Sequence, residues 1–109
     1  VYNPVKLCGN LIKIGGIGMG FVMIHRSVFE KLNRYYSELK YFPGLNNSNY
    51  PITEKEYHNS YHYFAEMNKE GKYLGEDMSF FHRLTDIGYD VWLDTSIELQ
   101  HIGSHVFGK

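Results

Sequence analysis

The run Gly75-Glu-Asp-Met-Ser-Phe-Phe-His-Arg-Leu-Thr-Asp-Ile-Gly-Tyr-Asp-Val-Trp-Leu-Asp94 decides the fold, because a helix signal in it is followed directly by a strand signal. The acidic pair Glu76-Asp77 begins the predicted helix, whose inner face is Phe80, Leu84 and Ile87. Gly88 stands where a left-handed cap ends a helix. Residues 89–94 then alternate at the period of a half-buried strand.

Upstream of this run, two shorter units carry similar signals. Residues 12–24 predict a strand ending near Ile14, a glycine turn, and a second strand at 20–25. The capping box Ser27-Val-Phe-Glu30 predicts a helix to about Tyr36, with Phe29, Leu32 and Tyr36 on one face.

Residues 41–51, rich in Asn, Gly and Pro, predict an exposed loop. A second capping box at 53–56 predicts a further helix with the apolar stripe Tyr57, Tyr61 and Phe64. A short extended piece is expected at 97–101, so the chain is α/β, with mixed strands and about three helices.

Composition limits the class of protein. The 109 residues suit one modest domain or a fragment, and the opening Val1-Tyr2-Asn3-Pro4 suggests a piece of a longer protein. A net charge of −1 gives no indication of a nucleic-acid partner, and no apolar run approaches the roughly 20 residues of a membrane span. One cysteine excludes an internal disulfide and a four-thiolate zinc site. Neutral charge and one cysteine suit a cytoplasmic enzyme.

The glycine turn Gly15-Gly-Ile-Gly-Met-Gly20 allows two interpretations. Apolar, strand-like residues follow it, which disfavours a dinucleotide fingerprint, and no Gly-Lys-Ser/Thr follows, which excludes a P-loop. The turn is either a tight, bulged connection, or a place where a ligand or a neighbouring helix comes close to the backbone.

Glu76 and Asp77 also allow two interpretations. Capping of the helix explains one acid, since the helix dipole stabilises a carboxylate there by roughly 0.3–1 kcal/mol. Two adjacent acids at a strand-to-helix corner that projects into a cleft are also well placed to act as a general base, although the helix dipole would lower the carboxyl pKa and work against basicity. On these physical grounds alone, capping is favoured.

Aromatic residues make up 17% of the chain, and ten of them are tyrosines. A tyrosine ring packs in a core or stacks on a sugar, so the segment 50–73 suggests a carbohydrate-binding surface as an alternative function. His58 and His62 have the i, i+4 spacing of a zinc helix, but no glutamate base lies between them and no third ligand is evident.

The order of the segments resembles the C-terminal half of GT-A-fold, nucleotide-sugar-dependent glycosyltransferases. The resemblance lies in Gly75-Glu76-Asp77 opening a helix, in the glycine, strand and aspartate that follow, and in the late His101-Ile-Gly103. The glycine turn followed by residues 20–26 resembles the upstream element of that family. The resemblance covers roughly residues 15–41 and 73–107, and it implies the C-terminal part of a Rossmann-like mixed sheet.

The resemblance also implies roles for particular residues. Asp77 is expected to be the base that deprotonates the acceptor hydroxyl, with Glu76 beside it, and His101 to help hold Mn²⁺ or Mg²⁺ on the donor diphosphate. Donor or acceptor contacts are expected from Gly18, Gly20, Tyr73, Gly75 and Trp92. Tyrosines of the variable segment 42–72, namely Tyr50, Tyr57, Tyr61 and Tyr63, are expected with Tyr73 to stack on sugar faces.

The chain departs from the family pattern in one large respect. It has no Asp-x-Asp, so the nucleotide-binding N-terminal half is expected elsewhere, as a partner of this segment. The expected activity is transfer of a hexosyl group from a nucleotide-sugar to a glycan, protein or lipid acceptor. As the base, Asp77 implies inversion at the anomeric carbon, whereas in a retaining enzyme it would orient the acceptor or stabilise charge on the sugar.

Overall fold

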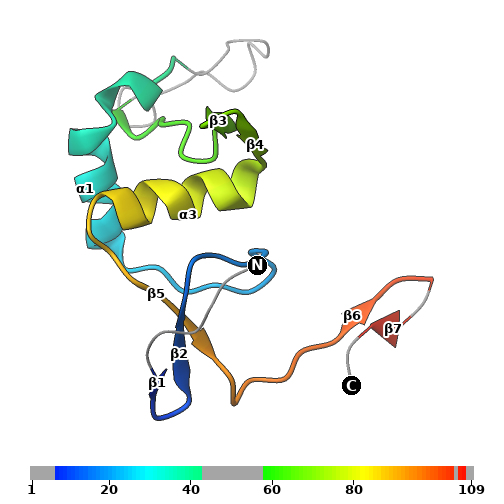
Figure 1. Cartoon of the computed structure of the whole chain (residues 1–109). Helices are drawn as coiled ribbons and strands as arrows, with labels where there is room; N and C mark the ends of the chain where they lie inside the picture. Colours follow the sequence, from blue (N-terminus) through cyan, green and yellow to red (C-terminus); the bar gives the residue numbers. More distant parts are fainter. Residues whose placement is uncertain (1–6, 43–57, 105, 108–109) are drawn as a thin grey trace.

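The computed structural model describes residues 7–42, 58–104 and 106–107 (Figure 1). Its elements, in chain order, are β1 (Leu7–Cys8), β2 (Leu11–Ile14), α1 (Arg26–Tyr35), the 3-10 helix η1 (Ser37–Leu39), β3 (Met67–Lys69), β4 (Lys72–Leu74), α3 (Glu76–Asp86), β5 (Val91–Asp94), β6 (His101–Ile102) and β7 (Val106–Phe107). The predicted mixed α/β class is confirmed. Every pairing between the described strands is antiparallel, so these strands do not form the parallel sheet of a Rossmann-like fold.

The main sheet has the strand order β1-β2-β5. β2 and β5 pair from Leu11 opposite Asp94 to Ile14 opposite Val91, which confirms both predicted strands. Beyond the strand end, the Thr95 amide and hydroxyl both donate to the Asn10 carbonyl, at 2.8 and 2.9 Å. The central strand of the sheet is therefore fixed to the strand that follows α3.

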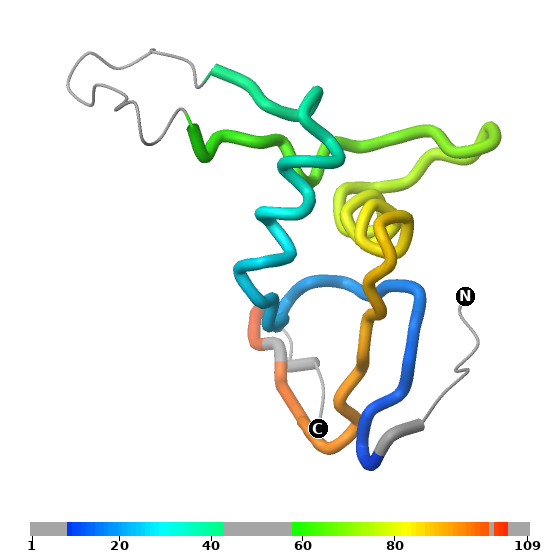
Figure 2. The backbone as a smooth tube through the Cα atoms, turned by 90° about the vertical axis from the view of Figure 1, so that its left-hand side faces the viewer, coloured from blue at the N-terminus to red at the C-terminus, as the bar shows by residue number. Residues whose placement is uncertain are grey.

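The core lies between α1 and α3, which run crosswise in both views (Figures 1 and 2). The inner face of α3 is buried as predicted, and the Phe80 ring is completely inaccessible. Leu32 of α1 meets it, while Phe29 packs at the margin of the same cluster. The Phe64 ring stacks on Phe80 with 4.6 Å between centroids. Burying an aromatic or leucine side chain stabilises a fold by roughly 1.5–3 kcal/mol, so this cluster is the main source of stability in the described part.

Two tight turns depend on positive backbone angles. Gly88 has φ +94° and ends α3, as predicted. Glu70 and Gly71 have φ +53° and +78°, the pattern of a two-residue turn that matches the twist of a hairpin, and they join β3 to β4. The hairpin was not predicted.

One predicted element is shorter than expected and one is wrong. The helix expected to carry the stripe Tyr57, Tyr61 and Phe64 extends no further than His58, which is helical, because residues 60–65 are not helical and Tyr61 forms a β-bridge with Lys40 instead. Backbone bonds from Tyr41 to Ser60 and from His62 to Leu39 hold that bridge. The start of this helix, at 53–56, lies outside the described residues, as does most of the loop expected at 41–51.

The strand expected at residues 20–25 is wrong, since the chain there is irregular and pairs with no described strand. The helix after it is confirmed, but its cap differs: the imidazole Nδ1 of His25 accepts from the Ser27 amide at 3.1 Å. Glu30 pairs with Arg26 at 3.0 Å rather than closing a capping box. Residues 97–100 lack strand structure, and β6 begins at His101.

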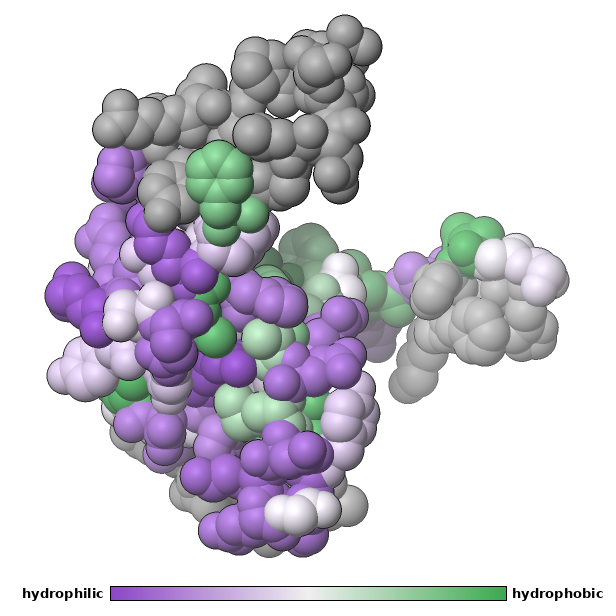
Figure 3. All heavy atoms as spheres, turned by 90° about the horizontal axis from the view of Figure 1, so that it is seen from above, coloured by the Kyte–Doolittle hydropathy of each residue, from purple (hydrophilic) through white to green (hydrophobic). Residues whose placement is uncertain are grey.

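The surface in Figure 3 is mostly hydrophilic, with apolar side chains in scattered places. No described helix has the length and apolar character needed to cross a membrane.

Candidate functional site

The first turn of α3 lies against the glycine turn. Asp77 is half-buried there, and its Oδ2 accepts a hydrogen bond from the Met19 amide at 3.3 Å, across 58 residues of sequence. Gly75 is the N-cap and no side chain caps the helix. Asp77 therefore has a long-range contact that helix capping does not explain.

Close packing against α3 explains why one position of the glycine turn, Gly16, carries no side chain. A Cβ atom at this buried position would lie 3.0 Å from Met78 Cε and 3.0 Å from Phe81 Cδ2. Of the two interpretations of the turn, the close approach of a neighbouring helix therefore holds at Gly16, and that helix is α3. At Gly18 and Gly20 an added Cβ would meet nothing within 4 Å, so their expected role in donor or acceptor binding stays a prediction.

Tyr73, Gly75 and Glu76, which were expected near Asp77, lie at the N-terminal end of α3 because they directly precede Asp77 in the chain. Glu76 is exposed. Tyr73, at the end of β4, is 65% exposed, and a hydrogen bond to Glu66 raises the pKa of its phenol, with smaller contributions from desolvation and nearby carboxylates. Tyr73, Gly75, Glu76 and Asp77 thus form one accessible corner beside the glycine turn, which we call the α3 corner.

Trp92 and His101 lie elsewhere. Trp92 is half-buried on β5, where its backbone pairs with Lys13. His101 pairs through its backbone with Phe107 in the β6–β7 hairpin, which lies away from α3 in both views (Figures 1 and 2), and its side chain is outside the described part. The structure does not bring His101 to the α3 corner.

The described residues do not fit a divalent cation on their own. Within residues 7–42 and 58–104, no group of three or more His, Cys, Asp or Glu side chains is placed to hold a metal. Mn²⁺ and Mg²⁺ prefer several oxygen ligands, which this donor set lacks. His58 and His62 do not share a helix, because residues 60–65 are irregular, so the helical zinc spacing is not formed.

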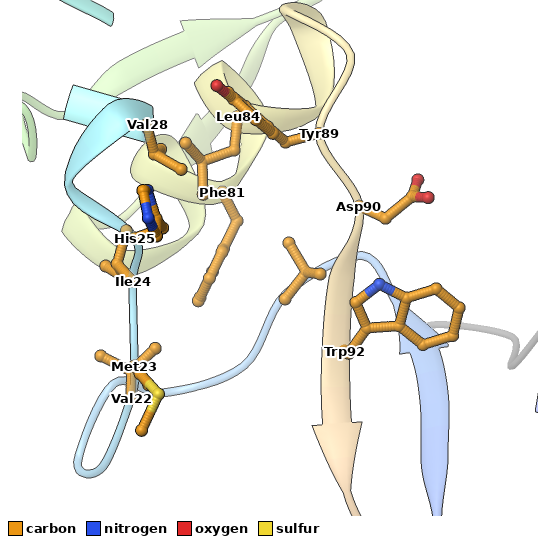
Figure 4. A pocket seen from close by; sticks show the side chains of 11 residues that line it. Val22, Met23, Ile24, His25, Val28, Phe81, Leu84, Tyr89, Asp90 and Trp92 are labelled. Carbon is orange, nitrogen blue, oxygen red and sulfur yellow. The ribbon is translucent and has the colours of Figure 1, made fainter. Parts of the chain in front are cut away.

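A hollow of about 240 Å³ opens between the segment before α1 and the strand β5 (Figure 4). Its lining is largely apolar and includes Val22, Met23, Phe81 and Val91. Phe81 extends into the space between residues 22–24 and β5. Phe81 lines this hollow and also contacts Gly16 in the glycine turn.

The expected sugar-stacking tyrosines are partly used for packing. Tyr63 packs edge-on against Phe29 and its hydroxyl donates to Asn33 at 2.7 Å, while burial raises the pKa of its phenol. Tyr61 stacks on Tyr63 and receives the Lys40 ammonium over its ring. Tyr50 and Tyr57 lie outside the described residues. Of this set, Tyr73 is the described member with a largely exposed ring.

Two buried polar residues of α3 went unnoticed in the sequence. Arg83 is 5% exposed, and its Nη1 donates to the carbonyls of Tyr63 and Ala65 at 3.0 and 2.8 Å. Ser79 is fully buried; its hydroxyl accepts from the Met67 amide and donates to the Leu74 carbonyl. These bonds fasten residues 63–67 and the β3–β4 hairpin to α3. The sequence could have indicated their burial, since Ser79 and Arg83 lie next to the apolar residues of the inner face of the helix.

Comparison with known proteins gives no match: no family model, no curated protein and no solved structure is similar to this chain.

Proposed function

We propose that this chain is the acceptor-side part of a glycosyltransferase that moves a sugar from a nucleotide-sugar donor to an acceptor hydroxyl, with Asp77 as the base. The observation that carries the proposal is the contact of Asp77 with the glycine turn, made by the Oδ2–Met19 hydrogen bond. The order of motifs supports it independently. Two segments that the resemblance assigns to one site, far apart in the chain, meet at the α3 corner.

The chemistry of Asp77 follows from its surroundings. Fixing Oδ2 on a backbone amide orients the carboxylate and leaves Oδ1 to accept the proton of an acceptor hydroxyl. As the acceptor oxygen attacks the anomeric carbon, the bond to the nucleoside diphosphate breaks, and the proton passes to Asp77. This role gives inversion of configuration.

The remaining assignments belong to the same proposal. Glu76 lies beside the base, while donor or acceptor contacts come from Tyr73, Gly75, Gly18 and Gly20. A contact from Trp92, which lies on β5 outside the α3 corner, would require a substrate that extends beyond this corner. His101, whose backbone lies in the β6–β7 hairpin away from the α3 corner, would be one ligand of the divalent cation, and the other ligands and the nucleotide site would come from a further segment of the enzyme. The cation would neutralise charge on the leaving diphosphate.

Donor turnover in the longest native polypeptide that contains this segment tests the proposal. A panel of nucleotide-sugars with manganese is assayed for hydrolysis and transfer, with Asp77→Asn and the matched control Asp86→Asn on the same helix. Asp77→Asn should lower kcat by about 10²–10⁴-fold, the usual contribution of a positioned base, with donor binding retained. Asp86→Asn should stay within about twofold of the parent kcat, because its carboxylate binds Tyr36 at the far end of α3.

Two results would contradict the proposal. One is full turnover by Asp77→Asn. The other is a silent panel together with no manganese-dependent binding of any nucleoside diphosphate. Sugar binding without turnover, unaffected by Asp77→Asn, would instead support a non-catalytic carbohydrate-binding domain that uses the tyrosine-rich segment.

A further inference from the structure

The imidazole of His25 serves as the N-cap of α1. Its Nδ1 accepts a hydrogen bond from the Ser27 amide at 3.1 Å, and the same nitrogen lies 2.8 Å from the Ser27 hydroxyl. The side chains usually found at this position are those of Ser, Thr, Asp and Asn, whose oxygens accept the bond at any pH near neutrality. A histidine cap differs from these, because its acceptor nitrogen can itself take up a proton.

The hydrogen bond determines which ring nitrogen carries the proton. A neutral imidazole has one N–H and one acceptor nitrogen, so Nδ1 accepts from the Ser27 amide only when the proton is on Nε2. A protonated ring has an N–H at both positions, and its Nδ1–H would point at the amide N–H of Ser27. The Ser27 hydroxyl can accept from the protonated ring, but the amide loses its acceptor.

The charges on α1 oppose a positive ring at this position. The first turn of the helix contains no acidic residue, and the helix begins with the cationic Arg26. A positive charge at a helix N-terminus is unfavourable, because that end of the helix dipole is itself positive. Glu30 lies in the next turn, where its carboxylate binds Arg26 at 3.0 Å. Protonation of His25 would therefore place a second cation beside Arg26.

The hollow does not supply a compensating charge. Of the described residues that line it, His25, Tyr89 and Asp90 are titratable, and the residues that α3 contributes are apolar. The Asp90 carboxylate binds Lys13 at 3.0 Å, and it points away from the imidazole in Figure 4. The capped arrangement thus favours the neutral ring from both sides.

The cap connects α1 to one wall of the hollow, which consists of residues 22–25. The His25 carbonyl accepts from the Val28 amide at 3.0 Å, so the ring and the backbone of this residue both hold the first turn of the helix. In the wall, Ile24 packs against the core, whereas Met23 is 96% exposed. A change at the cap is therefore passed to a segment that is only partly anchored in the core.

We propose that His25 is a proton-sensitive cap, which is intact when its ring is neutral and opens as the pH falls from about 7.5 to about 5, the range in which an imidazole gains its charge. Uptake of the proton breaks the bond to the Ser27 amide, and the first turn of α1 loosens together with residues 22–25. The sign follows from the bond: it stabilises the neutral form, so this stabilisation is complete at the upper end of the range and is lost on acidification. The inference does not depend on the proposed function.

Nitrogen NMR of the histidine rings, in the longest native polypeptide that contains this segment, tests the cap without any substitution. At about pH 7.5 the His25 ring should carry its proton on Nε2 and have an unprotonated Nδ1, and at about pH 5 both nitrogens should be protonated. A neutral ring with its proton on Nδ1 would overturn the inference. A Nδ1 that stays unprotonated at the lower pH would overturn it as well.

Hydrogen exchange in the same polypeptide measures the loosening. Protection of the amides of residues 27–30, relative to an unstructured peptide at the same pH, should fall about fivefold between about pH 7.5 and pH 5, as expected for loss of an N-cap. In His25→Asn, whose amide side chain caps without titrating, the change should be less than about twofold. The matched control His62→Asn, at an exposed histidine outside α1, should behave as the parent does. Constant protection in the parent, or an equal fall in His25→Asn, would refute the proton-sensitive cap.

Discussion

Gly16→Ala isolates the contact between the glycine turn and α3. The new methyl group would lie 3.0 Å from Phe81 Cδ2 and from Met78 Cε, inside ordinary van der Waals distance. Met78 is 43% exposed and its flexible end can move away. Phe81 is 2% exposed and packs edge-on against Phe80, so its ring cannot move without disturbing the core. Overpacking of this kind costs about 1–3 kcal/mol.

Gly18→Ala is the matched control. Nothing lies within 4 Å of its added methyl group and its φ is not positive, so the variant should be as stable as the parent or gain about 0.4–1 kcal/mol from a less flexible unfolded chain. In thermal unfolding, each kcal/mol corresponds to about 4–8 °C for a domain of this size. Gly16→Ala should therefore unfold about 4–24 °C below the parent, and Gly18→Ala at or above it. Equal Tm values for the two alanine variants would refute the close approach of α3 to the turn.

Three further perturbations examine the polar contacts of α3. Arg83→Met removes the donor to the half-buried carbonyls of Tyr63 and Ala65 and should lower the free energy of unfolding by about 2–4 kcal/mol in urea titrations. Arg34→Met, at an exposed position, should change it by less than about 0.5 kcal/mol, and similar losses for the two variants would contradict the role of the buried Arg83 side chain. Ser79→Ala should cost about 1–2 kcal/mol and speed amide exchange in the β3–β4 hairpin, whereas Thr85→Ala, which removes an exposed hydroxyl, should leave the hairpin amides unchanged. Burial first, then a hydrogen bond to a carboxylate, raises the pKa of Tyr36 to about 12, so its stabilising contribution is complete below pH 10 and is lost as pH rises from 10 to 12. Tyr36→Phe should flatten that alkaline decline in Tm, and an unchanged slope would argue against the hydrogen bond from the Tyr36 hydroxyl to Asp86.

The parts of the fold that could be predicted are those in which local signals agree. In α3 and β5, an acidic first turn, an apolar face at helical spacing, a capping glycine and an alternating pattern follow one another. The structure has the helix, the cap and the strand, although all four residues of β5 are half-buried rather than alternately buried and exposed. Leu32 and Phe29 on α1 likewise follow helical spacing into the core.

Tertiary contacts override the local pattern in the wrong and missed elements. Tyr61 and Phe64 have helical spacing, yet one pairs with Lys40 in a bridge and the other stacks on Phe80, and sequence spacing does not reveal these partners. The β3–β4 hairpin was missed because charged residues flank its turn, so no apolar alternation marks the strands. The prediction at 20–25 was wrong because a strand needs a neighbour, and none of the described strands pairs with it.

For the candidate site, the sequence alone favoured capping for the acids, and only the resemblance grouped Asp77 with the glycine turn. Their contact is present in the structure. The close contact of Gly16 with α3 depends on where the core places the Met78 and Phe81 side chains. The sequence therefore could not indicate which glycine of the turn makes this contact.

The helix α3 carries both the proposed base and the centre of the core. Asp77 stands three residues before Phe80, so one turn of helix separates the proposed base from the centre of the core. A selection for activity at this corner and a selection for heat resistance would therefore act on the same eleven residues. In a laboratory evolution experiment, gains in turnover obtained within α3 should carry a penalty in folding, and compensating changes should accumulate on α1 and β5, where the core can be repacked without disturbing the carboxylate.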